Sequence, residues 1–382
     1  MTAAPANNHS TAQEAQSPTQ KVAIVHDWLY GGGAEMVVEQ LHRLYPDAPV
    51  YTSYCSNEWR SRLEGRVVTG WLQHLGGGLL RKISVLPRIW WFRRLDLSSY
   101  DLVIISTGNG EAKFVRPPRS TTVICYCHSP NHFYWRHYQQ YLTQPGFGAL
   151  NPVIRLALKL LVGPLRRLDR RAAQRPDLFI ANSTHIQSDI TTFYGRDSEV
   201  VHPPVQIERF GRDSSAERHG FVTSGRIVPH KHVDIIVQAC SQSALPLTVV
   251  GDGPDLARLR QIAGPTVRFL GRATDQEVEQ ALASAQAFIF ASHDDFGIAP
   301  VEAMAAGTPV IAYRAGGALD YVVPGKTGEF FDSQTAESLT EALRTFQPDA
   351  YDSTAIRQHA ARFSPEHFRS SIGQLAQSAT RR

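Results

Sequence analysis

Short apolar runs alternate with helical patterns along most of the chain. Each run ends in a polar or turn residue, which is typical of buried parallel strands. We expect strands at 21–25, 101–106, 121–127 and 177–182, and a second series at 220–224, 247–251, 267–270, 287–291 and 309–312. Helical patterns fill gaps at 34–44, 234–240, 254–262, 275–283 and 300–306. This alternation predicts an α/β protein with two Rossmann-like parallel-sheet domains.

The domain boundary is expected near 202–220, where prolines, glycines and charged residues gather. A chain of 382 residues with 42% apolar content is too long for a single core. The polar segment at the start lacks the apolar centre of a signal peptide, so we expect it to be disordered. The predicted division is a leader at 1–20, domains at 21–205 and 206–362, and a final segment at 363–382 with a capped helix at 364–379.

Composition excludes several classes of protein. No run of about 18 apolar residues occurs, so we expect no transmembrane helix and a cytoplasmic protein. The four cysteines form no CxxC pair, which supports neither a disulfide framework nor a zinc site. A net charge of +4 gives little reason to expect nucleic-acid binding.

The segment 294–310, DDFGIAPVEAMAAGTPV, places the carboxylates of Asp294 and Glu302 eight residues apart around a Phe-Gly turn. We expect a helix at 300–306 that ends at Gly307, with Glu302 in its first turn beside backbone that attracts anions. One carboxylate can then hold sugar hydroxyls and the other a ribose, while the N–H groups of 297–299 face a diphosphate. The alternative is an ordinary acidic helix start before a buried strand.

Three other loops follow predicted strands and carry candidate chemistry. Ligands of open parallel sheets bind beyond the carboxyl ends of the strands, so with two such domains we expect the site in the interdomain cleft. The first loop, HDWLYGGGAE, has glycines that let the backbone approach a phosphate. The second, CYCHSPNHFYW, contains His128. The third, SGRIVPHKHVD, contains Arg226 and Lys231, which can bracket a diphosphate. The alternatives for these three loops are, in the same order, an ordinary tight turn, a buried structural histidine and a surface pair of basic residues. No GxGxxG fingerprint is present, which disfavours a nicotinamide dehydrogenase.

Two basic, apolar segments lie in the first half. The segment 79–94 contains five cations, and 151–175 contains seven cations against one acidic residue. Such surfaces suit the headgroups of an anionic membrane, although a half-buried helix with a solvated basic face is the alternative. We expect peripheral association with the inner face of the cytoplasmic membrane.

Together these motifs resemble the retaining GT-B glycosyltransferases of family 4 over about residues 21–378. The resemblance rests on Gly32 and Gly33, on His128, on the Arg226 and Lys231 pair, and on the spaced carboxylates, where Asp294 replaces the usual glutamate. The segments VHDWLYGGGAEMVVEQL and CYCHSPNHFYW look most like O-antigen and exopolysaccharide mannosyltransferases that use GDP-mannose. The resemblance implies a GT-B fold whose last helix crosses back to the first domain.

The resemblance also implies roles for individual residues. Arg226 and Lys231 would clamp the diphosphate, and Glu302 would bind the ribose. Asp294, with the N–H groups of Phe296, Gly297 and Ile298, would hold the donor sugar, and His128 would contact it from the opposite domain. Gly32 and Gly33 would let the first domain approach the phosphates, and the backbone around Leu270 would seat the base.

The implied reaction is metal-independent hexosyl transfer with retention and without a cofactor. The leaving charge would be carried by Arg226, Lys231 and helix N-termini, because adjacent Asp294 and Asp295 suit one binding carboxylate better than a metal cage. The predicted donor is GDP-mannose or another nucleotide sugar such as a UDP-sugar, and the acceptor is a glycan or a polyprenyl-diphosphate-linked glycan. A sugar-nucleotide epimerase or hydrolase and a non-enzymatic nucleotide-sugar sensor remain alternatives.

Overall fold

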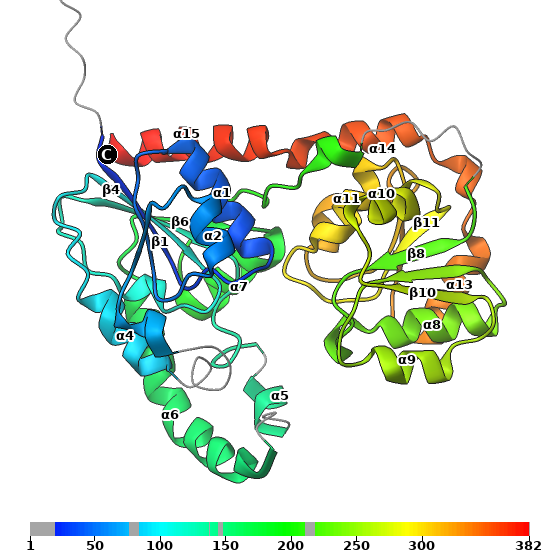
Figure 1. Ribbon diagram of the computed structural model, residues 1–382, viewed down its shortest axis with the longest axis horizontal. Coiled ribbons are helices and arrows are strands. Elements are labelled where there is room, and N and C mark those ends of the chain that lie inside the picture. The colour runs from blue at the N-terminus through cyan, green and yellow to red at the C-terminus, as the bar shows by residue number, and fades with distance from the viewer. Residues whose placement is uncertain (1–19, 76–83, 137, 144–147, 211–217, 382) are drawn as a thin grey trace, which may run out of the picture.

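The computed structural model describes residues 20–75, 84–136, 138–143, 148–210 and 218–381. The predicted leader, apart from Gln20, lies outside the described residues, as do 79–83 of the first basic segment. Figure 1 shows two α/β halves side by side, with the C-terminal helix running back from the second half over the first. Among the described residues, no helix is both long enough and apolar enough to span a membrane.

The first half is built on a parallel sheet of seven strands in the order β3-β2-β1-β4-β5-β6-β7. Its central strands are buried on both faces, as expected for a sheet covered by helices. The strands are β1 (Val22–His26), β2 (Val50–Thr52), β3 (Val67–Thr69), β4 (Leu102–Thr107), β5 (Thr122–Cys127), β6 (Leu178–Ala181) and β7 (Glu199–Val200). The helices are α1 (Gly33–Leu44), α2 (Asn57–Arg62), α4 (Val85–Arg93), α5 (Tyr138–Thr143), α6 (Asn151–Ala172) and α7 (Thr184–Tyr194).

The second half has a parallel sheet of six strands in the order β10-β9-β8-β11-β12-β13. The strands are β8 (Phe221–Ser224), β9 (Leu247–Val250), β10 (Val267–Gly271), β11 (Ala287–Phe290), β12 (Val310–Tyr313) and β13 (Gly328–Phe331). The helices are α8 (Val233–Gln242), α9 (Leu256–Ile262), α10 (Asp275–Ala283), α11 (Ile298–Ala305), α12 (Ala318–Tyr321), α13 (Ala336–Thr345) and α14 (Ser353–Ala360).

All nine predicted strands are present, and the α/β prediction with two Rossmann-like sheets is confirmed. The sequence interpretation missed β2, β3, β7 and β13. Three of these four are edge strands, which have one neighbouring strand and carry exposed or half-buried positions. Their apolar pattern is therefore too short to distinguish them from loops.

The final helix α15 (Pro365–Thr380) packs on the first half rather than on the half that precedes it. The Ser364 hydroxyl caps it by accepting from the His367 N–H at 3.1 Å, and Pro365 occupies its first position, where no N–H partner is needed. Phe368 and Ile372 are buried in the core that includes α1, and the Phe368 ring centroid lies 5.7 Å from that of Tyr126. Two chain segments therefore connect the halves.

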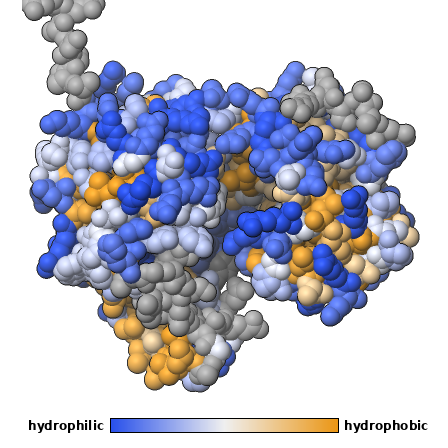
Figure 2. Space-filling model, viewed as in Figure 1, coloured by the Kyte–Doolittle hydropathy of each residue, from blue (hydrophilic) through white to orange (hydrophobic). Residues whose placement is uncertain are grey.

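The helix α6 projects from the first half and is exposed along much of its length (Figure 1). Its anchor is a buried cluster in which the Lys113 ammonium lies 3.0 Å from Asp169, and Asp169 also accepts from the Tyr194 hydroxyl at 2.9 Å. Figure 2 shows an apolar patch at the lower end of this half, where Figure 1 places α6. The exposed apolar side chains of this helix include Val153, Leu156, Leu160, Leu161 and Leu168.

Candidate functional site

A cavity of about 670 Å³ lies between the two halves, where the carboxyl ends of both sheets meet. Loops that follow β1, β5, β8 and β11 all contribute to its lining. Its location is the one at which open α/β sheets bind ligands. Of the residues predicted from sequence, the lining includes Gly32, Gly33, His128, Arg226, Lys231, Asp294, Phe296, Gly297 and Ile298.

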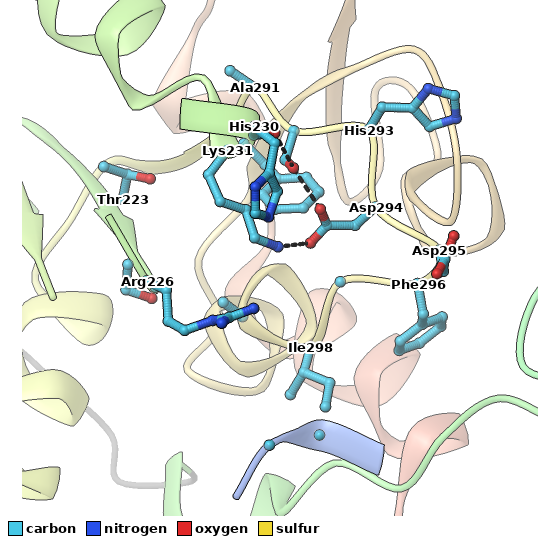
Figure 3. A pocket seen from close by; sticks show the side chains of 18 of the residues that line it. Thr223, Arg226, His230, Lys231, Ala291, His293, Asp294, Asp295, Phe296 and Ile298 are labelled. Atoms are coloured by element: carbon cyan, nitrogen blue, oxygen red, sulfur yellow. Dashed lines mark hydrogen bonds and ion pairs between the residues drawn. The ribbon is translucent and has the colours of Figure 1, made fainter. Parts of the chain in front are cut away.

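Asp294 lies at the centre of a polar cluster that Figure 3 shows from close by. One carboxylate oxygen pairs with the Lys231 ammonium, and the other accepts from the Ser292 hydroxyl. The Asp294 carbonyl accepts from the Gly317 N–H at 2.9 Å, so its backbone is fixed as well. A carboxylate and an ammonium, each mostly shielded from water, therefore face the cavity as a preformed pair.

Arg226 and Lys231 reach the cavity from opposite ends of one loop after β8. Arg226 is exposed and points into the cavity in Figure 3. Lys231 is placed by a short 3₁₀ turn, Pro229–Lys231, which ends at His232 in the left-handed region with φ of 51°. The two cations thus border the same space, as a diphosphate clamp requires.

His128 comes directly after β5 and contributes to the cavity from the first half. Its N–H donates to the Thr107 carbonyl at 2.8 Å, and its ring Nε2 lies 2.8 Å from the Ser106 hydroxyl oxygen. Burial, with a smaller effect from His26, lowers the pKa of His128 to about 3. At neutral pH the group is an uncharged imidazole, which suits hydrogen bonding to a sugar better than charge neutralisation.

The glycine loop lies against the first turn of α1, and Gly32 and Gly33 both line the cavity. The carboxylate of Glu35, in the first turn of α1, accepts from the Gly31 N–H at 2.9 Å and from the Tyr30 N–H at 3.3 Å. The two N–H groups that precede Gly32 are thus already bound by a carboxylate of the chain itself. A side chain at Gly33 would place its Cβ 2.7 Å from Ile298 Cδ1, so this glycine permits close approach of the two halves.

Asp295 turns away from Asp294 and toward the first half. Its carboxylate lies 3.2 Å from Arg136 Nη1 and 3.5 Å from His132 Nε2. Burial raises the pKa of Asp295 to about 6, against the opposing effect of Arg136. The two adjacent carboxylates therefore serve different partners.

Glu302 and Leu270 are not among the residues that line the cavity. The prediction that Glu302 lies in the first helical turn is wrong, because α11 begins at Ile298 after Gly297, which has φ of 87°. Pro300 fits within the first turn, where its missing N–H costs no hydrogen bond, and so does not mark the helix start. Burial raises the pKa of Glu302, with Arg209 opposing this effect.

Two family models cover consecutive parts of the chain. Residues 31–209 match the one described as Glycosyltransferase Family 4, and residues 205–363 match Glycosyl transferases group 1. The chain belongs to the family 4 glycosyltransferases of GT-B fold. The junction of the two matches falls in the connection between the two sheets.

Similar solved structures share this fold over nearly the whole chain. HepE from Anabaena, solved in complex with UDP-glucose, is 21% identical with a TM-score of 0.66, covering 94% of this chain and 99% of its own. The lipopolysaccharide outer core galactosyltransferase WaaB is 19% identical with the same TM-score and the same coverage. At this identity the likeness concerns the fold.

Curated relatives are more similar over shorter segments. A GDP-mannose-dependent alpha-mannosyltransferase of Mycobacterium tuberculosis is 44% identical over 110 residues, which is 28% of each chain. One of the same name from Mycolicibacterium smegmatis is 40% identical over 189 residues, which is 46% of this chain and 50% of the relative. The match thus spans half or less of the length of these relatives.

Several residues of the site escaped the sequence interpretation. Ser292, Glu35 and Arg136 are common polar residues that belong to no motif. Each forms a hydrogen bond or ion pair with a partner that only the folded structure brings close. Asn182 also lines the cavity and donates from its side chain to the His128 carbonyl at 2.9 Å. Its position directly after β6 was the available signal, since it matches that of the other site residues.

Proposed function

We propose that this protein transfers a hexose, mannose from GDP-mannose, to a hydroxyl of a membrane lipid-linked or polysaccharide acceptor with retention at the anomeric carbon. The observation that carries this proposal is the Lys231–Asp294 pair, which faces the cavity between two Rossmann-like sheets with Arg226 beside it and His128 opposite. This arrangement provides separate groups for the phosphates and for the sugar of one donor molecule.

The charges suggest how the donor is held. Arg226 and Lys231 bind the diphosphate, and they stabilise the negative charge that develops as the nucleotide leaves. Asp294 accepts hydrogen bonds from the donor sugar, and the backbone of Phe296, Gly297 and Ile298 forms the wall beside it. His128 contacts the sugar as a neutral hydrogen-bonding group.

The remaining assignments stay predictions. Glu302 for the ribose and Leu270 for the base lie outside the cavity lining, so they require a donor that extends beyond this space. We also propose that no metal takes part, because the site brings its own cations to the phosphates. The departing phosphate would then take the proton of the acceptor hydroxyl on the same face as the new bond.

The choice of mannose and of GDP rests on the names of the two mycobacterial relatives, since backbone recognition of the base discriminates poorly between purine and pyrimidine. Incubation with GDP-mannose and with UDP-sugars, with and without a polyprenyl-diphosphate-linked glycan, tests the proposal in the presence of EDTA. We expect acceptor-dependent release of GDP and an α-linked product. Release of GDP without acceptor would identify a hydrolase. Conversion of the donor sugar into another sugar would identify an epimerase, and donor binding without turnover would identify a sensor.

We further propose that α6 contacts an anionic membrane in which the acceptor is anchored. Its exposed leucines and valine share the helix with Arg155, Lys159 and Arg167, so apolar insertion and attraction to lipid phosphates act on one surface. Leu86 and Trp90 on α4 are exposed as well. In contrast, Arg88 is buried and pairs with Glu111 at 2.7 Å, so this cation of the first basic segment is not available to a membrane.

Flotation with vesicles containing anionic lipid tests the membrane contact. We expect the double variant Leu156→Glu/Leu160→Glu to lose about 100-fold or more in vesicle binding, because the burial of each leucine contributes about 1.5 kcal/mol or more and about 1.4 kcal/mol corresponds to a factor of ten. Leu319→Glu is the control, since Leu319 is an exposed leucine in the second half. Binding of the wild type that does not depend on anionic lipid, or equal loss in the control, would remove this part of the proposal.

A further inference from the structure

Arg136 lies between carboxylates that belong to different halves of the protein. Its guanidinium pairs with Asp189 on α7 and, at 3.2 Å, with Asp295 in the loop between β11 and α11. The three side chains are 18%, 15% and 24% exposed, so water screens them only partly. A single cation therefore neutralises two acidic groups that face each other across the junction.

The Asp295 backbone is held at the same place. Its carbonyl accepts from the Ser183 hydroxyl of the first half at 2.5 Å. The neighbouring carbonyl, that of Asp294, accepts from Gly317 in the second half. The loop that presents Asp294 to the cavity is thus fixed from both halves, and Figure 3 shows the side chains of Asp294 and Asp295 pointing in different directions.

Arg136 is itself anchored within the first half. The adjacent Trp135 donates from its ring N–H to Asp169 at 2.9 Å, and Arg166 donates to the Tyr134 carbonyl at 2.5 Å. Both partners belong to α6, whose Asp169 is fully buried. The guanidinium therefore approaches Asp295 from a firmly held segment.

We propose that Arg136 is a positioning residue, which neutralises Asp189 and Asp295 so that the halves stay closed with Asp294 directed at the donor. This inference rests on the proposed function, because it assigns a catalytic consequence to the orientation of Asp294. Arg136 itself neither lines the cavity nor belongs to the proposed diphosphate clamp of Arg226 and Lys231.

The charges predict an unusual order of effects among variants. Arg136→Gln leaves two carboxylates facing each other without their shared cation, and an unpaired, partly buried charge is costly. Asp295→Asn removes one of the two carboxylates and leaves Arg136 paired with Asp189. The double variant Arg136→Gln/Asp295→Asn contains no facing pair of like charges. The single variant Arg136→Gln should therefore have a lower kcat/KM than the double variant.

Transfer kinetics and small-angle scattering test this order. We expect Arg136→Gln to lower kcat/KM about tenfold or more and to increase the radius of gyration, and Asp295→Asn and the double variant to stay within about threefold of wild type. Arg314→Gln is the control, because Arg314 forms an exposed ion pair with Asp332 in the second half. Additive losses in the double variant, or an Arg136→Gln protein that matches the control, would overturn the proposal.

The pH profile separates positioning from a general structural role. In the wild type Asp295 has a pKa of about 6, and its side chain faces Arg136, Asp189, His132 and Ser129, while the charge of the adjacent Asp294 also acts on it. Burial, and after it the charge of Arg136, lowers the pKa of His132 to about 4, so loss of Arg136 raises the pKa of His132 as well. The double variant Arg136→Gln/Asp295→Asn undergoes the same change at His132 and therefore isolates the effect of Asp295. Loss of Arg136 raises the pKa of Asp295 further, so the carboxylate becomes neutral as the pH falls from 8 to 5.5.

We therefore expect kcat/KM of Arg136→Gln, divided by that of the wild type, to rise toward 1 over this pH range. The corresponding ratio for the double variant Arg136→Gln/Asp295→Asn should not rise. A ratio that does not change with pH would contradict the proposal. If the wild-type protein transfers no sugar, only the proposed function is overturned. The closure proposal is still tested, because small-angle scattering at pH 8 and pH 5.5 compares the radius of gyration of the same variants without turnover.

Discussion

Lys231→Ala tests whether the ammonium beside Asp294 carries charge from the leaving nucleotide. Removing one preorganised group that stabilises developing negative charge typically costs a factor of 100 to 1,000 in kcat. Lys231 shares this task with Arg226, and part of its charge is already engaged by Asp294. We therefore expect the lower end, about 100-fold, which corresponds to about 2.7 kcal/mol of transition-state stabilisation.

The same structure sets the expected effect on stability. The side chains of Lys231 and Asp294 are 24% and 17% exposed, between a surface pair, which contributes up to about 1 kcal/mol, and a fully buried pair, whose disruption costs about 3–5 kcal/mol. We expect a loss of about 1–2 kcal/mol in the free energy of unfolding. The variant should therefore remain folded at 25 °C, and loss of activity is not loss of fold.

Steady-state transfer kinetics with varied donor, combined with thermal unfolding, measure both quantities. Lys326→Ala is the control, because Lys326 is an exposed lysine of the second half outside the cavity lining. A kcat within a few fold of wild type would refute the role of Lys231 in leaving-group stabilisation. A change confined to the KM for the donor would refute it equally, since it would indicate binding that is the same in the ground and transition states.

Three further predictions concern closure, the histidine and the anchor of α6. Gly33→Val should lower kcat/KM about tenfold by holding the halves apart, and Ile298→Ala should restore most of it, because the added Cβ meets the Ile298 side chain; failure of this rescue would contradict the contact. His128 has a lowered pKa, so the folded state binds fewer protons than the unfolded state and stability falls as the pH falls from about 6.5 toward 3. His128→Asn should reduce that slope in chemical unfolding by up to about 1.4 kcal/mol per pH unit, and an unchanged slope would mean that this imidazole is not shielded. Lys113→Met leaves Asp169 buried without its ammonium and should cost about 3–5 kcal/mol in unfolding free energy; a loss below about 1 kcal/mol would show that the ion pair is unimportant.

The sequence by itself determined the class of fold and the types of residue at the site. Buried parallel strands require continuous apolar runs, and ligand-binding residues follow those runs, so the positions of His128, Arg226, Lys231 and Asp294 could be predicted from local pattern alone. The family resemblance assigned them possible roles. Edge strands such as β7 could not be predicted, because two residues carry too little pattern.

Only the tertiary structure decided which of these groups meet. The pairs Lys231–Asp294 and Arg136–Asp295 join residues that are 63 and 159 positions apart, and their partners depend on how the loops pack. The same packing directs Glu35 to the glycine loop and leaves Glu302 outside the cavity lining. Local pattern fixes where a side chain leaves a strand or helix, but its charge partner is set by long-range packing and burial, which no short stretch of sequence contains.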